Sequence, residues 1–287
     1  MNSLSTGLGF LLMASAAMAT SINAVHPYGW GANIGWLNFR GNVVNGTEIG
    51  LYYTTGNVWS ANCGWISLGS GAPTNGYSYA NNSSTDWGVN LILPGGHLRG
   101  FAYGANIGWI AFETNGNPRV DLVTGNLSGY VWGANVGWIG LSNSQAFVQT
   151  EYLGWGLDAD ADGIPDAFEF AKTGSLTNLT SGGDADDDGQ TDDGEFFADT
   201  DPLDDGDLLE ITALSRSDPT NRVTWTVKPT RFYRLDQASI PGDNAVWTDS
   251  GLGLLSPGAG PTLTGAVTAA SATVRVYRAN AVIPLTP

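Results

Sequence analysis

Aromatic and apolar side chains alternate with small or polar residues in four similar segments in the first half of the chain. Residues 129–140 read GYVWGANVGWIG, and related phrases occupy residues 100–111, 28–39 and 57–68. Aromatic and β-branched residues fall on opposite faces of an extended chain, which is typical of strands. The Asn of the Gly-Ala-Asn triplet tolerates the left-handed backbone that tight turns need. Each phrase therefore predicts a β-hairpin.

The spacing of the phrases indicates a repeat. Trp36 and Trp65 lie 29 residues apart, as do Trp109 and Trp138, and a fixed period of this size is typical of repeat architectures. We expect a further strand at residues 120–123 and a mainly β, repeat-built antiparallel domain over residues 20–150. The phrase resembles the GYAWSENIGWISF-type repeats of exported bacterial proteins over residues 28–142, and this resemblance implies export.

The repeated tryptophans have two alternative roles. Their recurrence favours a ladder in the core, in which each Trp buries roughly 150–250 Å², and truncating Trp138 would then harm folding more than binding. The alternative is a row of exposed aromatic platforms that bind a polysaccharide. The candidate ligand-binding residues are Tyr103, Trp109, Trp132 and Trp138.

The first 19 residues predict a signal peptide. They contain the apolar run LGFLLMASAAMA and end in Ala-Met-Ala, a small-x-small cleavage pattern. No later apolar run is long enough to span a bilayer, so we expect a secreted or cell-surface protein. The single cysteine, Cys63, excludes an internal disulfide. It occupies the position of Ile34, Ile107 and Val136 in the other phrases, which predicts a buried apolar role.

Negative charge is concentrated in one segment. Residues 158–207 hold 17 of the 27 acidic residues but only one of the 11 basic residues, and charges elsewhere balance. Such a chain is not expected to bind nucleic acid or anionic lipid. It is expected to bind cations.

Two twelve-residue phrases in this segment have the spacing of EF-hand-like calcium loops. DADADGIPDAFE (residues 158–169) and DADDDGQTDDGE (residues 184–195) place acids at positions 1, 3, 5, 9 and 12, with glycine at position 6. Oxygen ligands, a backbone carbonyl at position 7 and a terminal glutamate suit calcium better than magnesium. The predicted ligands are Asp158, Asp160, Asp162, Ile164, Asp166 and Glu169 in the first loop, and Asp184, Asp186, Asp188, Gln190, Asp192 and Glu195 in the second.

The loops lack the flanking helices of an EF-hand pair, although a short helix is expected after each. The whole pattern, with the Thr-Asp-Pro that follows, resembles the thrombospondin type 3-like calcium repeats of exported bacterial proteins. This resemblance implies that Asp199 and Asp201 belong to the same metal array. Dockerin modules are the rival family, but they end the loop in Asp and place small hydroxyl residues at positions 10 and 11. We assign residues 151–207 to a calcium-binding connector.

The C-terminal part returns to short strands separated by turn residues. Segments such as NRVTWTV and RFYRLDQA predict a small β-sandwich over residues 208–287. The FYRL and RVYR phrases resemble the fibronectin type III-like domains that follow such calcium repeats.

No pattern of catalytic residues is present in the sequence. The only histidines are His26 and His97, and the acids of the first domain are scattered. We therefore expect a non-enzymatic protein with a structural or adhesive role at the cell surface or in a matrix. Its expected partners are calcium ions and either a polysaccharide or another surface protein.

Overall fold

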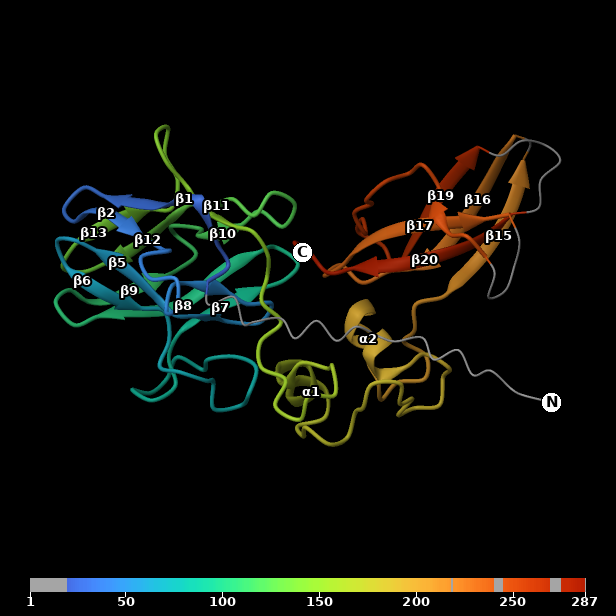
Figure 1. The fold of residues 1–287 in the computed structure, drawn as a ribbon, viewed down its shortest axis with the longest axis horizontal. Helices are drawn as coiled ribbons and strands as arrows, with labels where there is room; N and C mark the ends of the chain where they lie inside the picture. Colours follow the sequence, from blue (N-terminus) through green and yellow to red (C-terminus); the bar gives the residue numbers. More distant parts are fainter. Residues whose placement is uncertain (1–19, 218, 240–244, 269–274, 287) are drawn as a thin grey trace, which may run out of the picture.

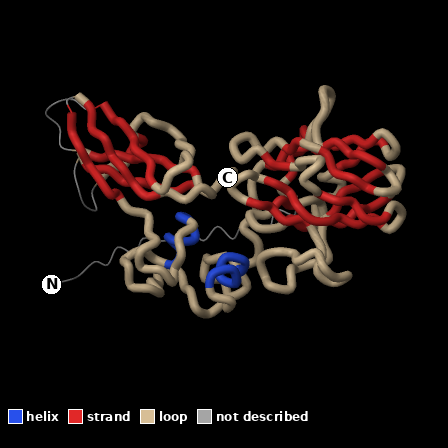
Figure 2. The backbone as a smooth tube through the Cα atoms, turned by 180° about the vertical axis from the view of Figure 1, so that it is seen from behind, coloured by secondary structure: helices blue, strands red, loops and turns tan. Residues whose placement is uncertain are grey.

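The computed structural model describes residues 20–217, 219–239, 245–268 and 275–286. The predicted signal peptide lies outside the described residues. Within these residues the chain is mainly β, with antiparallel sheets and two short helices, as expected. One β unit contains the N-terminal half, another contains the C-terminal part, and the segment that carries both helices lies between them (Figures 1 and 2).

Eight strands of the N-terminal unit form a closed ring of antiparallel pairings. Around the ring, β8 pairs with β6, β6 with β5, β5 with β2, β2 with β1, β1 with β13, β13 with β12, β12 with β9, and β9 again with β8. The strands are β1 (Ile22–Gly31), β2 (Gly35–Asn38), β5 (Asn57–Ser60), β6 (Gly64–Ser67), β8 (His97–Gly104), β9 (Gly108–Phe112), β12 (Tyr130–Gly133) and β13 (Gly137–Gly140). We call this closed sheet the cylinder.

Each repeated phrase forms one hairpin of the cylinder, and all four hairpins have the same register. We number them in chain order: hairpin 1 (β1–β2), hairpin 2 (β5–β6), hairpin 3 (β8–β9) and hairpin 4 (β12–β13). The aromatic residues directly opposite each other are Trp30 and Trp36, Trp59 and Trp65, Tyr103 and Trp109, and Trp132 and Trp138.

Short strands extend the cylinder at the end opposite the hairpin turns. These are β7 (Val89–Ile92), β10 (Arg119–Val120), β11 (Leu127–Ser128) and β14 (Val148–Thr150), while β3 (Glu48–Ile49) and β4 (Thr54–Thr55) pair separately. The strand expected at residues 120–123 is therefore only partly right. It ends at Val120 because the Asp121 carboxylate accepts hydrogen bonds from the backbone N–H of Val123 (2.9 Å) and Thr124 (2.8 Å), which forms a turn.

The expected tryptophan core ladder is wrong. The apolar residues that alternate with the tryptophans fill the interior, and Val58, Ile66, Ile110, Val131 and Ile139 are at most 3% exposed. The four repeated tryptophans are instead 44–50% exposed. The interior of an eight-stranded closed sheet is just wide enough for side chains to fill, and Ile and Val already occupy it. The period-two alternation therefore directs the indoles outward.

The turns of the hairpins close one end of the cylinder. Ile34, Cys63, Ile107 and Val136 are all buried there, so the expected role of Cys63 is confirmed. In hairpin 4 a Cβ added at Gly133 would lie 2.6 Å from the Val136 side chain. In hairpin 3 a Cβ added at Gly104 would lie 2.8 Å from the Ile107 side chain. Hairpin 2 has buried Ser60 at this position, opposite the smaller Cys63. The larger Ser60 is thus accommodated by the smaller Cys63, whereas the other hairpins combine Gly with Ile or Val.

The turn asparagines do not take the left-handed conformation that we expected of them. That conformation belongs to the glycine before each tryptophan, as at Gly137 with φ 75°, as three-residue hairpin loops require. Each asparagine Nδ2 instead donates a hydrogen bond to a backbone carbonyl in the preceding hairpin of the ring. The four bonds run from Asn33 to Val136 (3.0 Å), Asn62 to Ile34 (3.0 Å), Asn106 to Cys63 (3.2 Å) and Asn135 to Ile107 (3.0 Å). The bonds form a closed circle.

The middle segment contains α1 (Asp166–Lys172) and α2 (Asp192–Ala198), each beginning at position 9 of a predicted loop. The buried Phe168 and Phe196 pack edge to face, with ring centroids 5.5 Å apart. They belong to the same core cluster as the interior of the cylinder. The segment is therefore packed against the N-terminal unit.

The C-terminal unit consists of two three-stranded antiparallel sheets. One contains β15 (Ile211–Ser217), β16 (Thr220–Thr226) and β19 (Thr262–Thr268), and the other contains β18 (Thr248–Asp249), β17 (Phe232–Ala238) and β20 (Val276–Val282). Between them lies a second core with Trp225, Tyr233 and Leu235 at its centre. The β19 strand was missed by the sequence analysis, because its Gly and Thr residues give a weak apolar alternation.

Candidate metal centres and aromatic surface

The first predicted loop brings its first three carboxylates together. Ligand oxygens of Asp158, Asp160 and Asp162 all lie within 4.8 Å of one another. The Asp158 carboxylate also accepts hydrogen bonds from the backbone N–H groups of Asp162 (3.2 Å) and Gly163 (3.0 Å). Gly163 has φ 97°, which accounts for glycine at position 6. The backbone thus wraps around the Asp158 side chain.

The second loop repeats this geometry. Oxygens of Asp184, Asp186 and Asp188 also lie within 4.8 Å of one another. The Asp184 carboxylate accepts from the backbone N–H groups of Asp188 (3.1 Å) and Gly189 (3.0 Å). Gly189 has φ 94°. Two loops separated in sequence thus adopt one conformation.

The position-9 aspartates link each loop to its helix. Asp166 accepts a hydrogen bond from the backbone N–H of Ala159 (2.7 Å), and Asp192 accepts from that of Ala185 (3.0 Å). Each aspartate is the first residue of its helix, where a negative charge is favourable. This contact brings the start of each helix next to the start of its loop.

The position-12 glutamates carry the strongest indication of a bound cation. The Glu169 and Glu195 side chains are 0% exposed, and neither oxygen of either one has a hydrogen-bond partner. Burial, followed by the repulsion of the loop aspartates, raises the pKa of each glutamate to about 8, and at Glu195 the nearby Thr200 hydroxyl partly opposes this rise. A buried carboxylate without a partner costs several kcal/mol, and a cation between it and the aspartates removes that cost.

The position-7 residues use their side chains for packing. The Ile164 side chain is buried in the core. The Gln190 side chain donates to the Thr200 hydroxyl (2.7 Å) and accepts from the Leu209 backbone N–H (2.9 Å). The backbone carbonyl is therefore the group that each would contribute to a metal.

The structure places Asp199 and Asp201 outside both three-aspartate clusters. Asp199 ends α2 in a left-handed conformation (φ 59°), accepts a hydrogen bond from Thr230 and lies 3.8 Å from the Arg231 guanidinium. Asp201 accepts from the backbone N–H of Leu203 (3.3 Å). Both acids have contacts outside the two loops.

Sequence reasoning missed Arg231, which joins the middle segment (residues 151–207) to the C-terminal unit. Its guanidinium is buried and donates to the carbonyls of Phe196 (2.9 Å) and Phe197 (2.8 Å) at the end of α2. A cation at a helix C-terminus is favourable. No local pattern around this arginine distinguishes it from a surface residue, because its partners lie about 35 residues away in the chain.

The outer surface of the cylinder carries aromatic rings from all four hairpins. The four predicted residues are exposed: Tyr103 (39%), Trp109 (46%), Trp132 (42%) and Trp138 (48%). Ring centroids are 4.9 Å apart for Tyr103 and Trp109, and 5.0 Å apart for Trp132 and Trp138. Their equivalents in hairpins 1 and 2, which we had not assigned to binding, have the same exposure: Trp30, Trp36, Trp59 and Trp65. We call these eight residues the aromatic girdle.

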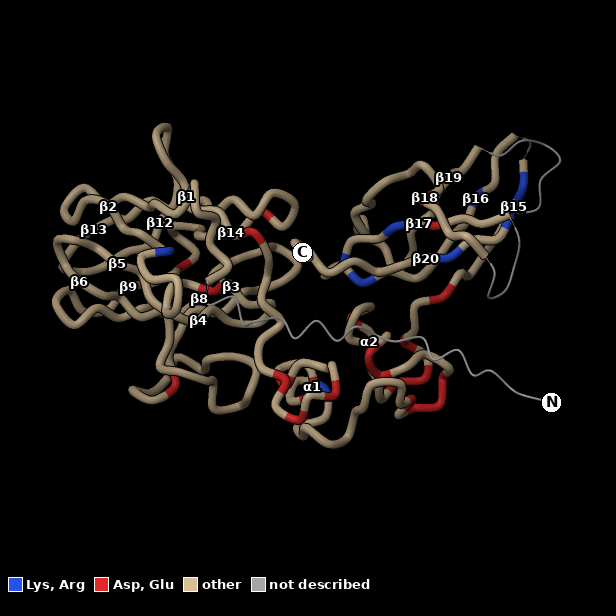
Figure 3. The backbone as a smooth tube through the Cα atoms, in the orientation of Figure 1, with Lys and Arg blue, Asp and Glu red and all other residues tan. Residues whose placement is uncertain are grey.

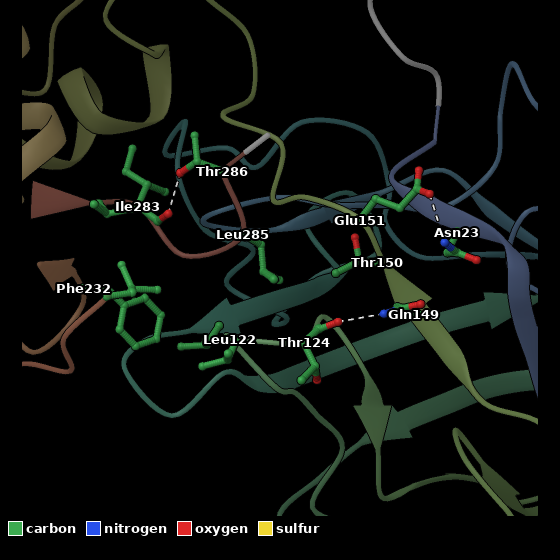
Figure 4. A pocket seen from close by; sticks show the side chains of 13 residues that line it. Asn23, Leu122, Thr124, Gln149, Thr150, Glu151, Phe232, Ile283, Leu285 and Thr286 are labelled. Carbon is green, nitrogen blue, oxygen red and sulfur yellow. Dashed lines mark hydrogen bonds between the residues drawn. The ribbon is translucent and has the colours of Figure 1, made fainter. Parts of the chain in front are cut away.

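A cavity of about 470 Å³ lies where the C-terminal unit meets the cylinder (Figure 4). Its walls are a mixture of polar and apolar side chains, with Leu122, Phe232 and Leu285 projecting toward it. Glu151 is the one ionisable residue among those lining it, and it accepts a hydrogen bond from Asn23 (2.9 Å). This set of side chains offers no pairing of a base with a nucleophile.

Comparisons with known proteins find no matching family model, no matching curated protein and no matching solved structure. Within the described part of the chain, neither helix has the length and apolar character needed to cross a bilayer. Function is therefore argued from the two acidic loops and the aromatic girdle.

Proposed function

We propose that this is an exported, calcium-stabilised modular protein with a non-enzymatic, structural or adhesive role at the cell surface or in a matrix. The observation that carries the proposal is the burial of Glu169 and Glu195, whose four carboxylate oxygens have no partner within the described structure. The loop aspartates repel the charge of each glutamate, and acidic segments gather around α1 and α2 in Figure 3. A cation at each loop would neutralise this charge.

The donor set supports calcium as the cation. Each loop offers carboxylate oxygens and a backbone carbonyl and no sulfur or imidazole, which suits a hard cation with six to eight ligands. Magnesium favours a strict octahedron and retains water, whereas a buried terminal glutamate can supply both oxygens to calcium. Zinc sites in proteins are built mainly from histidine nitrogen and cysteine sulfur, which neither loop contains.

The organisation proposed for the chain has four parts. Residues 1–19 are a signal peptide, residues 20–150 a repeat-built Trp domain, residues 151–207 a thrombospondin type 3-like calcium connector, and residues 208–287 a fibronectin type III-like β-sandwich. The chain does not fit the dockerin alternative, which expects hydroxyl residues at loop positions 10 and 11. In the first loop these positions hold Ala167 and Phe168.

Calorimetry of the chain from Thr20 onward with calcium tests the proposal. We expect at least two calcium ions to bind, and we expect Asp158→Ala with Asp162→Ala to remove one while leaving the second loop intact. Asp184→Ala with Asp188→Ala is the reciprocal variant. Absence of calcium uptake by the wild-type protein would refute the proposal.

Carbohydrate binding is a second candidate function. The exposure of the aromatic girdle favours it, because rings that project from a rigid sheet are available to stack on sugars. Tryptophan fluorescence titrated with a panel of polysaccharides tests this function. The competing explanation for the exposed rings is that they bind another surface protein. If no polysaccharide changes the emission, this function is excluded.

A further inference from the structure

We infer that the aromatic girdle is a multivalent site for uncharged β-linked glucan chains, with one binding position at each of the four seams between neighbouring hairpins. The inference rests on the second function proposed above, and it adds the ligand class, the location and the number of positions.

The strand register arranges the girdle as a continuous band. Within a hairpin the two aromatic residues lie directly opposite each other. Across the seam between hairpins 3 and 4, Trp132 lies opposite Ala111, so Trp109, two residues before Ala111, is its diagonal neighbour. Diagonal neighbours in a sheet are about 7–8 Å apart, within reach of aromatic side chains. The same relation recurs at the other three seams.

Each seam has a small residue between its two rings. The residues opposite the first aromatic of each hairpin are Gly140, Asn38, Ser67 and Ala111. None of the four is large enough to cover the neighbouring indoles, and Asn38 and Ser67 add hydrogen-bonding groups. A seam therefore presents two rings with a small residue between them as its floor, and beside Gly140 the Tyr130 ring lies over that residue, since an added Cβ would be 3.3 Å from it.

The rings are held in place without a ligand. Three of the cross-strand pairs have centroids 4.8–5.0 Å apart and interplanar angles of 58–62°. Hairpin 3 has an additional ring, since Trp87 packs edge to face on Trp109 at 5.1 Å. Pre-ordered rings reduce the entropy lost on binding.

The charge of this surface selects the ligand class. Residues 28–38, 57–67, 101–112 and 130–141 contain no Asp, Glu, Lys, Arg or His, and the turn end of the cylinder is free of red and blue in Figure 3. A polyanion would find no cation here, and a charged peptide would lose hydration without gaining an ion pair. β-Linked glucose has equatorial hydroxyls, so both faces of each sugar present C–H groups that can stack on indoles.

Calorimetry of the chain from Thr20 onward with cellohexaose tests the inference. We expect more than one and at most four chains to bind, with the same result in calcium and in chelator. Ala111→Glu places a charge on the floor of one seam and leaves every ring in place, so it should remove one equivalent of ligand. Ala213→Glu, an exposed alanine on β15, is the matched control and should change nothing.

The other outcomes are distinct. A single equivalent would overturn the multivalent arrangement and leave carbohydrate binding in place, whereas no binding of cellohexaose would overturn the glucan assignment. Binding of polygalacturonate in preference to cellohexaose would contradict the uncharged ligand class. Concentration-dependent dimerisation abolished by Ala111→Glu would show that a second copy of the chain occupies the girdle.

Discussion

Trp138 and Ile139 are neighbours in sequence with opposite environments. Ile139 is 0% exposed inside the cylinder, whereas Trp138 is 48% exposed on the girdle. We expect Ile139→Ala to lower the free energy of unfolding by about 2–5 kcal/mol. We expect Trp138→Ala to cost less, because it loses only the half-buried part of the ring and the pairing with Trp132, which is worth about 0.5–1.5 kcal/mol beyond that burial. Urea denaturation of both variants measures the difference, and a larger loss for Trp138→Ala would contradict the outward orientation.

The pairing of Ser60 with Cys63 predicts a non-additive double substitution. Cys63→Ile alone overfills the turn end of hairpin 2 and should destabilise it by about 1–3 kcal/mol. Adding Ser60→Gly recreates the Gly–Ile combination of hairpins 1 and 3, so the double variant should recover most of the loss. Thermal unfolding of the two single variants and the double variant forms the test cycle. Additive losses would show that the two positions do not share space.

At the scale of elements, the β17–β20 pairing depends on one buried acid. Burial alone would raise the pKa of Asp236, but hydrogen bonds and charges from Arg234 and Arg278 outweigh burial and hold it below its ordinary value. Asp236 therefore stabilises the fold fully above about pH 4, the unfolded value. This contribution falls as the pH drops through the lower folded-state pKa. We expect Asp236→Asn to destabilise the protein at pH 7 and to differ little from wild type at the acid end.

Urea titrations at several pH values check this expectation. Asp205→Asn, at an exposed acid, is the control and should match wild type throughout. An Asp236→Asn deficit that grew toward low pH would contradict the sign derived from the lowered pKa.

The loop–helix elements predict opposite effects of one substitution with and without calcium. Glu195→Gln keeps the shape of the side chain and removes its ionisable group. In chelator at pH 7 the wild-type glutamate must take up a proton to be buried, because its pKa is raised to about 8 in the folded state; the amide has no such cost, so the variant should be more stable than wild type. In calcium it should be less stable, because one ligand is weakened. Melting temperatures in both conditions measure this, and a variant that melts below wild type in chelator would argue against the buried, unpartnered glutamate.

At the scale of the whole molecule, the middle segment (residues 151–207) packs on both β units. Phe168 and Phe196 join the core of the cylinder, and Arg231 fixes the end of α2 to the C-terminal unit. Chelation should therefore expose residues 158–207 to protease while the cylinder, whose core is made by its own strands, persists. Limited proteolysis with mass spectrometry checks the cleavage sites. Equal resistance of this segment with and without chelator would show that calcium does not order it.

The sequence by itself determined the local structure of this protein. Alternation of aromatic and branched residues defined the four hairpins, and the acid-and-glycine spacing defined two loops that adopt one conformation. Both patterns are local, because a strand repeats every two residues and a loop ligand set fits within twelve. The buried Cys63 could also be predicted, since its three equivalents are Ile or Val.

Only the tertiary structure decided which face of each hairpin is inside. Trp138 and Ile139 are both apolar, so alternation alone permits either orientation, and closure of eight strands leaves interior space for the smaller side chain. Contacts between distant segments likewise form the circle of asparagine hydrogen bonds and the bonds from Arg231 to the end of α2. They also bury Glu169 and Glu195. These contacts are absent from any local pattern because they form only when the cylinder closes and the two units pack against the helices.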